Sequence, residues 1–340
     1  MRPVEALDRV VYLLDRTLAE SRKVRAFLRA REVAAEVGDD ELIRRRKEGT
    51  LTELAGIGPV TAAIITEAVD GEVPAYLAEL EDKTVLPIGE GAELRAALKG
   101  DCHSHSLWSD GGAPIEKMAR TAQALGHEYL VMTDHSPRLT VAHGLTAKRL
   151  KEQLAEIAKL NEELAPFRIL TGIEVDILPD GSLDQSEEML SQLDVVVASV
   201  HSKLRMPRPE MTRRMVLALA NPHVDILGHC TGRKVVGTGR PQSQFDPEIV
   251  FAACKRFDVA LEINCRPERQ DPPDDLVELA LEWDLHFSID TDAHAPGQME
   301  WQAYGCDKAA RHGIEAVQIV NTWAADDLLA WAGSHTNQTP

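Results

Sequence analysis

The sequence of 340 residues has no long apolar run and no excess of positive charge. No run approaches the roughly 18 apolar residues that a membrane span requires, so no membrane partner is expected. The first twenty residues carry acidic side chains and no small-residue cleavage site, which predicts an amphipathic helix and a cytoplasmic location. The net charge of −18 disfavours unspecific adhesion to duplex DNA.

Several motifs of common enzyme classes are also missing. The five cysteines are scattered and form no C-x-x-C pair, which excludes a zinc knuckle and gives no sign of a disulfide framework. No G-x-S-x-G elbow is present, so no serine hydrolase is indicated. No phosphate-binding glycine loop or G-x-G-x-x-G occurs either, so a nucleotide cofactor is not implied.

Two regions differ in their hydrophobic pattern. Residues 1–98 predict an all-helical domain, because apolar residues recur at helical spacing, as at Val10, Leu14 and Leu18. Residues 99–334 alternate short apolar runs with amphipathic stretches, and residues 335–340 are expected to be a disordered tail. With the segment ending at His103, the candidate strands are Tyr129–Met132, Arg168–Ile173, Asp194–Val200, Val224–Leu227, Val259–Ile263 and His286–Ile289. Helical stretches between them are expected near 113–125, 146–163, 209–220, 247–257, 274–283 and 306–312.

Seven strand–helix units in this length favour an α/β fold with a closed parallel barrel over a small open sheet. Histidine and acidic residues fall where the candidate strands end. In a parallel barrel all these ends open on one face, so the side chains should converge there. The converging candidates are His103, His105, Asp110, His135, Glu174, His201, His229, Asp292 and His294.

The spacing within this set has a physical reason. Residues two apart on a strand point the same way, so His103 and His105 can reach one ion, and so can Asp292 and His294. Each ion takes about four to six nitrogen or oxygen donors, so nine ligands can serve three ions. Such a cluster polarises phosphate oxygens and activates water. The other six histidines fall on helices, loops or strand starts and are given no ligand role.

Basic residues near the same strand ends are candidates for holding a substrate phosphate. They are Lys203 after the fourth strand, Arg233 after the fifth and Arg269 after the sixth. The guanidinium fork of arginine suits phosphate oxygens. A solvated surface role is an equally good interpretation of each residue.

The segments that carry the candidate ligands resemble a known family. DCHSHSLWSDG, VMTDHS, GIEVDILPDGSLD, VVVASVHS, DILGHCTGR, LEINCRPERQD and SIDTDAH are similar to the PHP (polymerase and histidinol phosphatase) family. They look most like the C-terminal PHP domain of family X DNA polymerases. The resemblance covers about residues 100–325 and implies a distorted (β/α)7 barrel. It also implies three Zn, Mn or Fe ions on the nine ligands named above. The implied chemistry is that of a phosphatase, a 3′–5′ exonuclease or a 3′-end phosphoesterase.

The N-terminal region is similar to the helical domain at the N-terminus of the same polymerases. Its segment 51–69 looks like a helix-hairpin-helix, in which the turn Gly56, Ile57 and Gly58 would present backbone N–H groups to a DNA phosphate. DNA ends are therefore an expected partner. An αα-hairpin used only for packing is the alternative interpretation.

Two departures from the polymerase pattern limit what the resemblance implies. Val60, Thr61 and Ile64 stand where basic residues are usual, which weakens DNA binding and removes the lysine that a lyase would need. The chain also passes from the helical domain to the barrel within about 15 residues, which leaves no room for a polymerase palm. We therefore expect neither lyase nor polymerase activity.

Four functions remain open at this point. A phosphoesterase acting at DNA ends agrees with the hairpin and the polymerase-like barrel. A small-molecule phosphatase, for example one that acts on histidinol phosphate, agrees with the negative net charge and with a hairpin that lacks the usual basic residues. An amidohydrolase would usually need a bridging Lys or carboxylate after its fourth strand, where this chain has His201. A scaffold without catalysis would not need nine ligands.

Overall fold

The computed structural model describes residues 1–84, 86 and 89–335, and the chain divides into two compact units. The first unit comprises residues 1–87 with 296–298, and the second comprises residues 88–295 with 299–340. The division falls at residue 87, not after the predicted residue 98. The reason is that helix α5 (Ala92–Ala97) packs on α12 (Gln302–Arg311) of the second unit.

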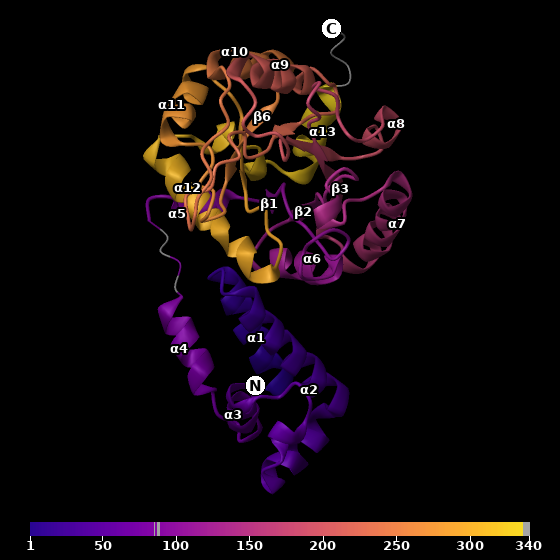
Figure 1. Ribbon diagram of the computed structural model, residues 1–340, viewed down its shortest axis with the longest axis vertical. Helices are drawn as coiled ribbons and strands as arrows, with labels where there is room; N and C mark the ends of the chain where they lie inside the picture. Colours follow the sequence, from indigo (N-terminus) through magenta and orange to yellow (C-terminus); the bar gives the residue numbers. More distant parts are fainter. Residues whose placement is uncertain (85, 87–88, 336–340) are drawn as a thin grey trace. The chain divides into compact units, whose positions relative to one another are not determined.

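The first unit is all-helical, as predicted. Its elements are α1 (Pro3–Arg16), α2 (Ser21–Glu48), the 3-10 turn η1 (Leu51–Glu53), α3 (Pro59–Val69) and α4 (Ala75–Lys83). Helix α1 buries one apolar stripe, including Leu7, Val10 and Leu14, against α2 and α3 (Figure 1). Helix α2 is broken at Gly38, whose φ of 77° only glycine adopts without strain.

The second unit contains seven parallel strands in sequential order. They are β1 (Gly100–Asp101), β2 (Tyr129–Met132), β3 (Arg168–Asp176), β4 (Val195–Ser199), β5 (Ile226–Leu227), β6 (Ala260–Asn264) and β7 (Phe287–Asp290). The segments that follow β1 and β7 meet through a bridge between Ser104 and Ala293 and a 2.8 Å bond from His105 N to Ala293 O. The sheet therefore nearly closes into the predicted (β/α)7 barrel.

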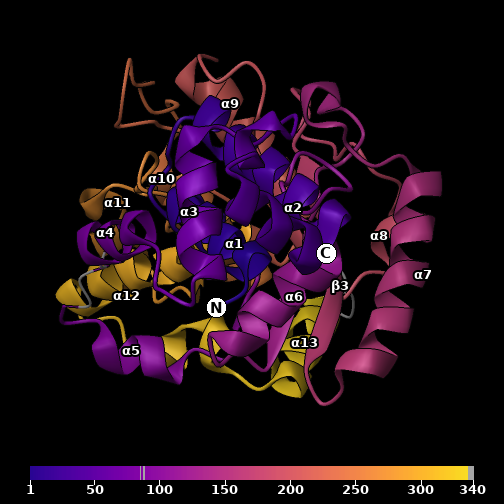
Figure 2. The same cartoon turned by 90° about the horizontal axis from the view of Figure 1, so that it is seen from below.

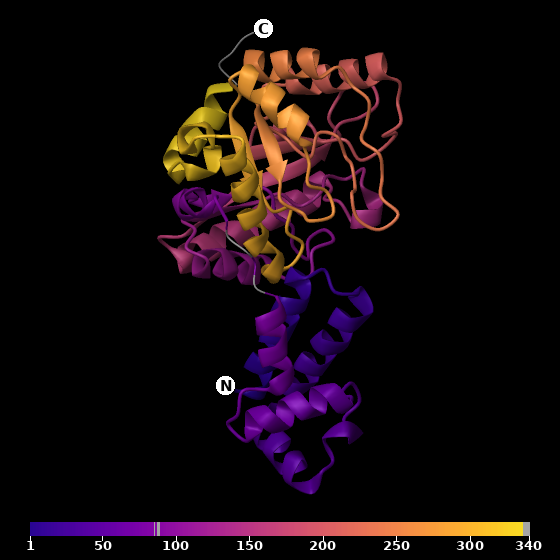
Figure 3. The same ribbon diagram turned by 90° about the vertical axis from the view of Figure 1, so that its left-hand side faces the viewer.

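Helices cover the outside of this barrel. They are α6 (Ile115–Ala124), α7 (Ala147–Leu164), α8 (Glu187–Leu190), α9 (Arg208–Leu219), α10 (Pro247–Phe257), α11 (Asp274–Glu282) and α12, whereas α13 (Ala325–His335) packs at one end of the barrel. The remaining 3-10 turns are η2 (Thr140–Ala142), η3 (Pro296–Trp301), η4 (Ala316–Gln318) and η5 (Val320–Thr322). Figure 2 shows α7 alongside β3, and Figure 3 shows the neighbouring α9 and α10 in salmon and orange.

The C-terminal helix α13, which the sequence analysis missed, closes the barrel interior. Leu328 and Trp331 pack with inward-facing strand residues such as Val197 and Ile226. His335 had been assigned to a disordered tail, but it is buried and its Nδ1 lies 2.9 Å from Asp225 Oδ1. The rest of the predicted tail, residues 336–340, lies outside the described residues.

Within the described part of the chain, no helix combines the length and the apolar character needed to cross a membrane.

Candidate metal centre

The candidate ligands gather at the carboxyl ends of the strands, and Glu174 lies at their centre. Its carboxylate is within 3.4 Å of His103 Nε2, 2.7 Å of His135 Nδ1, 3.2 Å of His201 Nε2 and 3.0 Å of His229 Nε2. Strand β3 runs three residues beyond its predicted end at Ile173, so Glu174 lies within the strand. One almost fully buried carboxylate thus faces histidines from four other strand ends.

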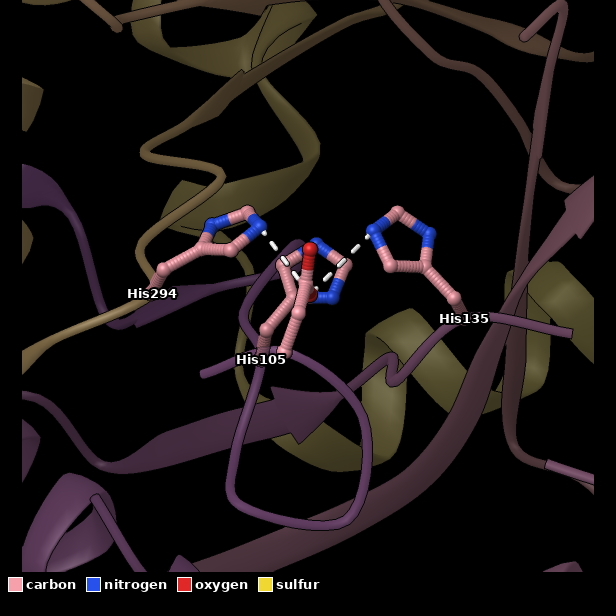
Figure 4. A group of neighbouring side chains, drawn as sticks. His105, His135 and His294 are labelled. Carbon is pink, nitrogen blue, oxygen red and sulfur yellow. Dashed lines mark ion pairs between the residues drawn. The ribbon is translucent and has the colours of Figure 1, made fainter. Parts of the chain in front are cut away.

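Asp110 forms a second, more exposed point of convergence. Its Oδ1 lies 3.5 Å from His135 Nε2 and 3.3 Å from His294 Nε2. Figure 4 shows the rings of His105, His135 and His294 turned toward a common space, with dashed lines marking the ion pairs. The Nδ1 of His294 lies 2.8 Å from both Asp292 O and the Arg266 Nη1, which leaves its Nε2 as the nitrogen that faces Asp110.

Asp292 joins the cluster from the segment after β7. Its Oδ1 lies 3.4 Å from His105 Nε2, and its backbone has a left-handed φ of 49°. Aspartate tolerates this conformation better than most residues, although it still carries strain. The Arg269 Nε lies 3.3 Å from Asp292 Oδ2, so this ligand also faces a cation.

All nine predicted ligands are therefore brought together, in overlapping sets. Three groups have donor atoms within 4.8 Å of one another: His105, Asp110, His135 and His294; His103, His105 and Glu174; and His135, Glu174 and His201. His229 and Asp292 adjoin these groups through Glu174 and His105 respectively. The overlap means that several residues could serve two ions at once.

The candidate ligands suit metal ions because several of their buried nitrogen and oxygen atoms lack a hydrogen-bond partner. Buried ring nitrogens of His103, His105, His201 and His229, and both carboxylate oxygens of Glu174, have no hydrogen-bond partner of good geometry among the described residues. A buried polar atom without a partner is costly, and metal ligation is one way to satisfy it. Imidazoles and carboxylates together suit zinc, manganese or iron.

The charge state of the central carboxylate also favours cation binding. Burial alone would raise the pKa of Glu174, but the imidazoles of His201, His103 and His135 hold it well below its usual range. Glu174 is therefore a carboxylate anion at neutral pH. An ionised carboxylate surrounded by nitrogen donors is ready to take a cation.

Two of the histidines are kept neutral by their surroundings. Burial lowers the pKa of His105 well below its usual range, and His294 and His135 lower it further. Burial and the nearby Arg269 lower the pKa of His229 to about 4. Neutral imidazole is the form that binds metal, so these two histidines do not have to release a proton before they bind an ion.

Glu262 is a functional residue that the sequence analysis missed. Its Oε1 lies 2.6 Å from His103 Nδ1, which leaves His103 Nε2 directed at Glu174. Burial alone would lower the pKa of His103, but Glu262 and Glu174 raise it well above its usual range. The one signal in the sequence was an acidic residue inside the apolar run of β6, at an inward-facing position.

The three predicted phosphate contacts have different surroundings. Arg269 lies beside the ligand Asp292, as described above. Lys203 is exposed after β4, with a left-handed φ of 50°. The Arg233 Nε donates to Arg269 O at 3.1 Å, and its Nη2 donates to Gln270 O, so this guanidinium braces the loop that carries Arg269.

Arg266 is a second cation at the cluster that sequence reasoning missed. Its Nη1 donates to Asp292 O at 2.7 Å and lies 3.6 Å from Asp292 Oδ1. Its guanidinium also stacks over Trp301 at 5.4 Å, which holds it in place. The sequence offered only a second arginine near Arg269, without a reason to prefer it.

A cavity of about 470 Å³ lies between β6, the loop after it and α12, rather than over the metal cluster. Arg233, Lys308 and Arg311 are among its lining residues. Asn264 lines it too and donates to Asp292 Oδ2 at 3.2 Å, so this side chain separates the cavity from the cluster. The cluster itself is the better site for chemistry, because it holds the unsatisfied donors.

In the N-terminal unit, backbone N–H groups of the predicted hairpin turn donate hydrogen bonds within the segment itself. Ile57 N donates to Leu54 O at 2.9 Å, and Gly58 N donates to Thr61 Oγ1 at 2.9 Å. Gly56 adopts a φ of 108°, as the tight turn requires. DNA contact at Gly56, Ile57 and Gly58 stays a prediction.

The arginines at the end of α2 are likewise occupied. Arg44 pairs with Glu41 at 2.6 Å and with Glu48 at 2.7 Å, and Arg46 pairs with Asp70 at 2.6 Å. The positive charges of Arg44 and Arg46 are therefore balanced by acidic neighbours.

In a comparison with known protein families, the model of the PHP domain matches residues 101–250. The DNA polymerase/3'-5' exonuclease PolX of Bacillus subtilis (strain 168) is 39% identical over 234 residues, which cover 69% of this chain and 41% of that protein. A probable phosphatase of Thermoanaerobacter sp. (strain X514) is 34% identical over 170 residues, 48% of this chain and 63% of that protein. The chain thus spans less than two thirds of the length of either relative.

Among solved structures, histidinol phosphate phosphatase from Lactococcus lactis subsp. lactis Il1403, complexed with zinc, L-histidinol and phosphate, is similar with a TM-score of 0.46. It is 20% identical, and the match covers 64% of this chain and 94% of that one.

Proposed function

Because residues 101–250 form a PHP domain, we propose that this chain is a metal-dependent phosphoesterase that hydrolyses phosphate esters at DNA ends. The observation that carries the proposal is the convergence of histidines and carboxylates from six strand ends around Glu174. Hydrolysis at such a centre adds water across a P–O ester bond and yields an alcohol and a phosphate product. It requires no nucleophilic side chain.

Three overlapping donor groups support a centre of three divalent ions, either zinc, manganese or iron. Ions bound there would polarise phosphate oxygens and lower the pKa of a coordinated water. The protein's own part is to hold the donors in place. Glu262 orients His103, and ionised Glu174 is shared among the groups.

The cations beside the cluster would hold the substrate phosphate. Arg266 and Arg269 both lie within 3.6 Å of the Asp292 carboxylate, so a phosphate on the ions would come within their reach. Lys203 and Arg233 remain predicted phosphate contacts further out. Neutralising the phosphate charge in this way would stabilise the extra charge that develops during hydrolysis.

DNA ends are the preferred substrate because the Bacillus subtilis relative, named a polymerase and 3'-5' exonuclease, is 39% identical to this chain. The hairpin at Gly56, Ile57 and Gly58 is proposed as a second, weaker DNA contact. The arginines just before it, at the end of α2, are already paired, so most of the binding free energy would have to come from the barrel mouth.

A small-molecule phosphatase is the second candidate. The net charge of −18, the paired arginines of the hairpin and the 34% identity to a probable phosphatase favour it. Activity on a 3′-ended oligonucleotide compared with histidinol phosphate would separate the two candidates. Faster turnover of histidinol phosphate would reject the DNA-end proposal.

The decisive experiment combines metal analysis with a substrate panel. The purified protein should contain zinc, manganese or iron in more than one equivalent, and His103→Ala with His105→Ala should remove metal and hydrolysis while the far-UV spectrum is kept. His223→Ala is the matched control, because this imidazole precedes β5 at the opposite end of the strands. Activity that survives loss of both His103 and His105 would refute the metal mechanism.

A further inference from the structure

The loops at the barrel mouth are divided by charge. The loops after β4, β5 and β6 (residues 200–207, 228–246 and 265–273) contain seven Lys and Arg residues and three acidic ones. The loops after β1, β2 and β3 (residues 102–114, 133–146 and 177–186) contain one Arg and four acidic residues. A chain with a net charge of −18 therefore places net positive charge on one side of its candidate active site.

Four of these cations form a surface that we call the cationic ridge: Lys203, Arg205, Lys234 and Arg240. Three of them are exposed and Arg240 is half-buried. Across the described residues, none of the four has an acidic side chain within ion-pair distance, although the Arg240 Nε donates to Gly232 O at 2.6 Å. Unpaired cations gathered on one side create a positive potential that attracts an anionic ligand.

The ridge is one continuous structure, because its loops are joined to each other. Lys234 and Arg240 face one another across a short hairpin, with Lys234 N donating to Arg240 O at 2.9 Å. A Cβ added at Gly232 would lie 3.0 Å from Leu204 Cδ2, which packs the Lys203–Arg205 segment on this hairpin. Burial, Arg269 and Arg240 lower the pKa of Lys234, as expected where positive charges crowd together.

The ridge also connects to the metal centre. Val235 N donates to Glu268 O at 2.7 Å, which ties the hairpin to the loop that carries Arg266 and Arg269. Those two arginines contact the ligand Asp292. A row of positive charge therefore leads from the ions outward over the β4–β6 side of the mouth.

From this arrangement we infer that the cationic ridge binds phosphates adjacent to the scissile one, so that the preferred substrate is a single nucleic-acid strand rather than a compound with one phosphate. The inference rests on the proposed function and specifies its substrate class. One phosphate is already matched by the ions with Arg266 and Arg269, so a monoester leaves the ridge unused. The exposed Val235 and Val236, at 48% and 58%, would offer apolar contact to sugars and bases.

The test compares two substrates with the same scissile bond. The dinucleotide TpT contains the scissile phosphate alone, whereas a ten-thymidine strand adds flanking phosphates. The variant Lys234→Gln with Arg240→Gln should lower kcat/KM on the strand roughly tenfold at 50 mM salt, relative to its kcat/KM on TpT. The salt slope for the strand should become shallower by about 1.4, since each contact on single strands contributes about 0.7.

A matched control removes the same charges elsewhere. Lys159→Gln with Arg256→Gln removes one exposed Lys from the C-terminal half of α7 and one exposed Arg from the last turn of α10, on helices whose C-terminal ends point away from the mouth. This control should retain the wild-type ratio and slope. Equal losses in both double variants, or an equal loss on TpT and on the strand, would overturn the inference.

Failure of the inference and failure of the proposed function give different results. Binding of a fluorescein-labelled ten-thymidine strand, measured by anisotropy, needs no turnover. Salt-dependent binding that Lys234→Gln with Arg240→Gln weakens would support the ridge even in a protein without hydrolysis. Hydrolysis of the strand with unchanged binding and slope in this variant would keep the proposed function and reject the ridge.

Discussion

The end of helix α2, just before the hairpin of the N-terminal unit, and the cationic ridge of the barrel both carry basic residues, but they differ in what surrounds those side chains. Arg44 and Arg46 are held by Glu41, Glu48 and Asp70. The four ridge cations have no acidic partner among the described residues. Exposed ion pairs are mutually neutralised and add little, whereas unpaired cations create a field that draws anions. The number of basic residues in a region therefore says less about its ligand than their pairing does.

The two units also differ in histidine. All twelve histidines lie at position 103 or later, so the N-terminal unit has none and the barrel has them all. Imidazole ligands and histidine titration are thus confined to the barrel. The following changes should affect one unit and spare the other.

The largest effect is expected for Glu174→Gln in the barrel. The substitution keeps the shape of the side chain but removes the charge that four histidines face. The rate of hydrolysis should fall more than about a hundredfold. Loss of a residue that only hydrogen-bonds to a metal ligand typically costs about 10- to 100-fold. Metal content by mass spectrometry should fall in parallel, and the exposed Glu163→Gln should change neither. Normal metal content in Glu174→Gln would contradict the assignment of Glu174 as the shared ligand.

Glu262→Gln should have the next largest effect. The residue contacts the ligand His103 at 2.6 Å, so its loss weakens the orientation of that ring. We expect a drop of about 10- to 100-fold in metal affinity or activity, measured by titration with a competing chelator. Added metal should restore much of the activity, which a misfolded variant would not show.

Acid should destabilise the barrel through His127, which lies outside the metal cluster. Burial, with the nearby Arg95, lowers the pKa of His127 to about 3 from its usual 6.5. The unfolded chain takes up a proton below pH 6.5 while the folded barrel does not. Stability present above pH 6.5 is therefore lost as the pH falls toward 3, by up to about 1.4 kcal/mol per pH unit.

Denaturant unfolding of His127→Gln at pH 6, 5 and 4 checks this prediction. The variant should have a shallower dependence of the unfolding free energy on pH than the wild type, at equal metal saturation. Identical slopes would mean that His127 is protonated in the folded protein. The N-terminal unit has no histidine, so its stability should show no histidine-linked dependence on pH in this range.

The smallest effect is expected for Arg44→Gln with Arg46→Gln at the end of α2, just before the hairpin. Because both arginines are already paired with carboxylates, strand binding by anisotropy should change less than about twofold. This result, set beside the roughly tenfold effect expected at the ridge, would confirm the contrast between the two regions. A loss as large as that of the ridge variant would show that the hairpin is the main DNA contact.

Much of the barrel could be predicted from local pattern. The strand Tyr129–Met132 and the helix 247–257 have their predicted bounds, and the other predicted elements shifted by a few residues at their ends. The all-helical character of the first unit also followed from apolar spacing. Helix α13 was missed, although its buried residues, among them Leu328, Trp331 and His335, recur at the three- and four-residue spacing of a helical stripe.

The nine candidate ligands could be found in the sequence because a parallel barrel brings all strand ends to one face. Their positions along the chain were enough to predict that they meet. The relations among them were not available from position alone. Glu262 contacts His103 across 159 residues of sequence, and no local pattern encodes such a pair.

The sequence by itself determined the order of strands and helices and the identity of the donors, since both depend on periodicity along the chain. The tertiary structure decided that Glu174 is the shared carboxylate, that Arg233 braces a loop, and that the ridge cations are unpaired while the hairpin arginines are not. The physical reason is that pairing and burial depend on distances in space between residues far apart in sequence, which are fixed only when the chain has folded.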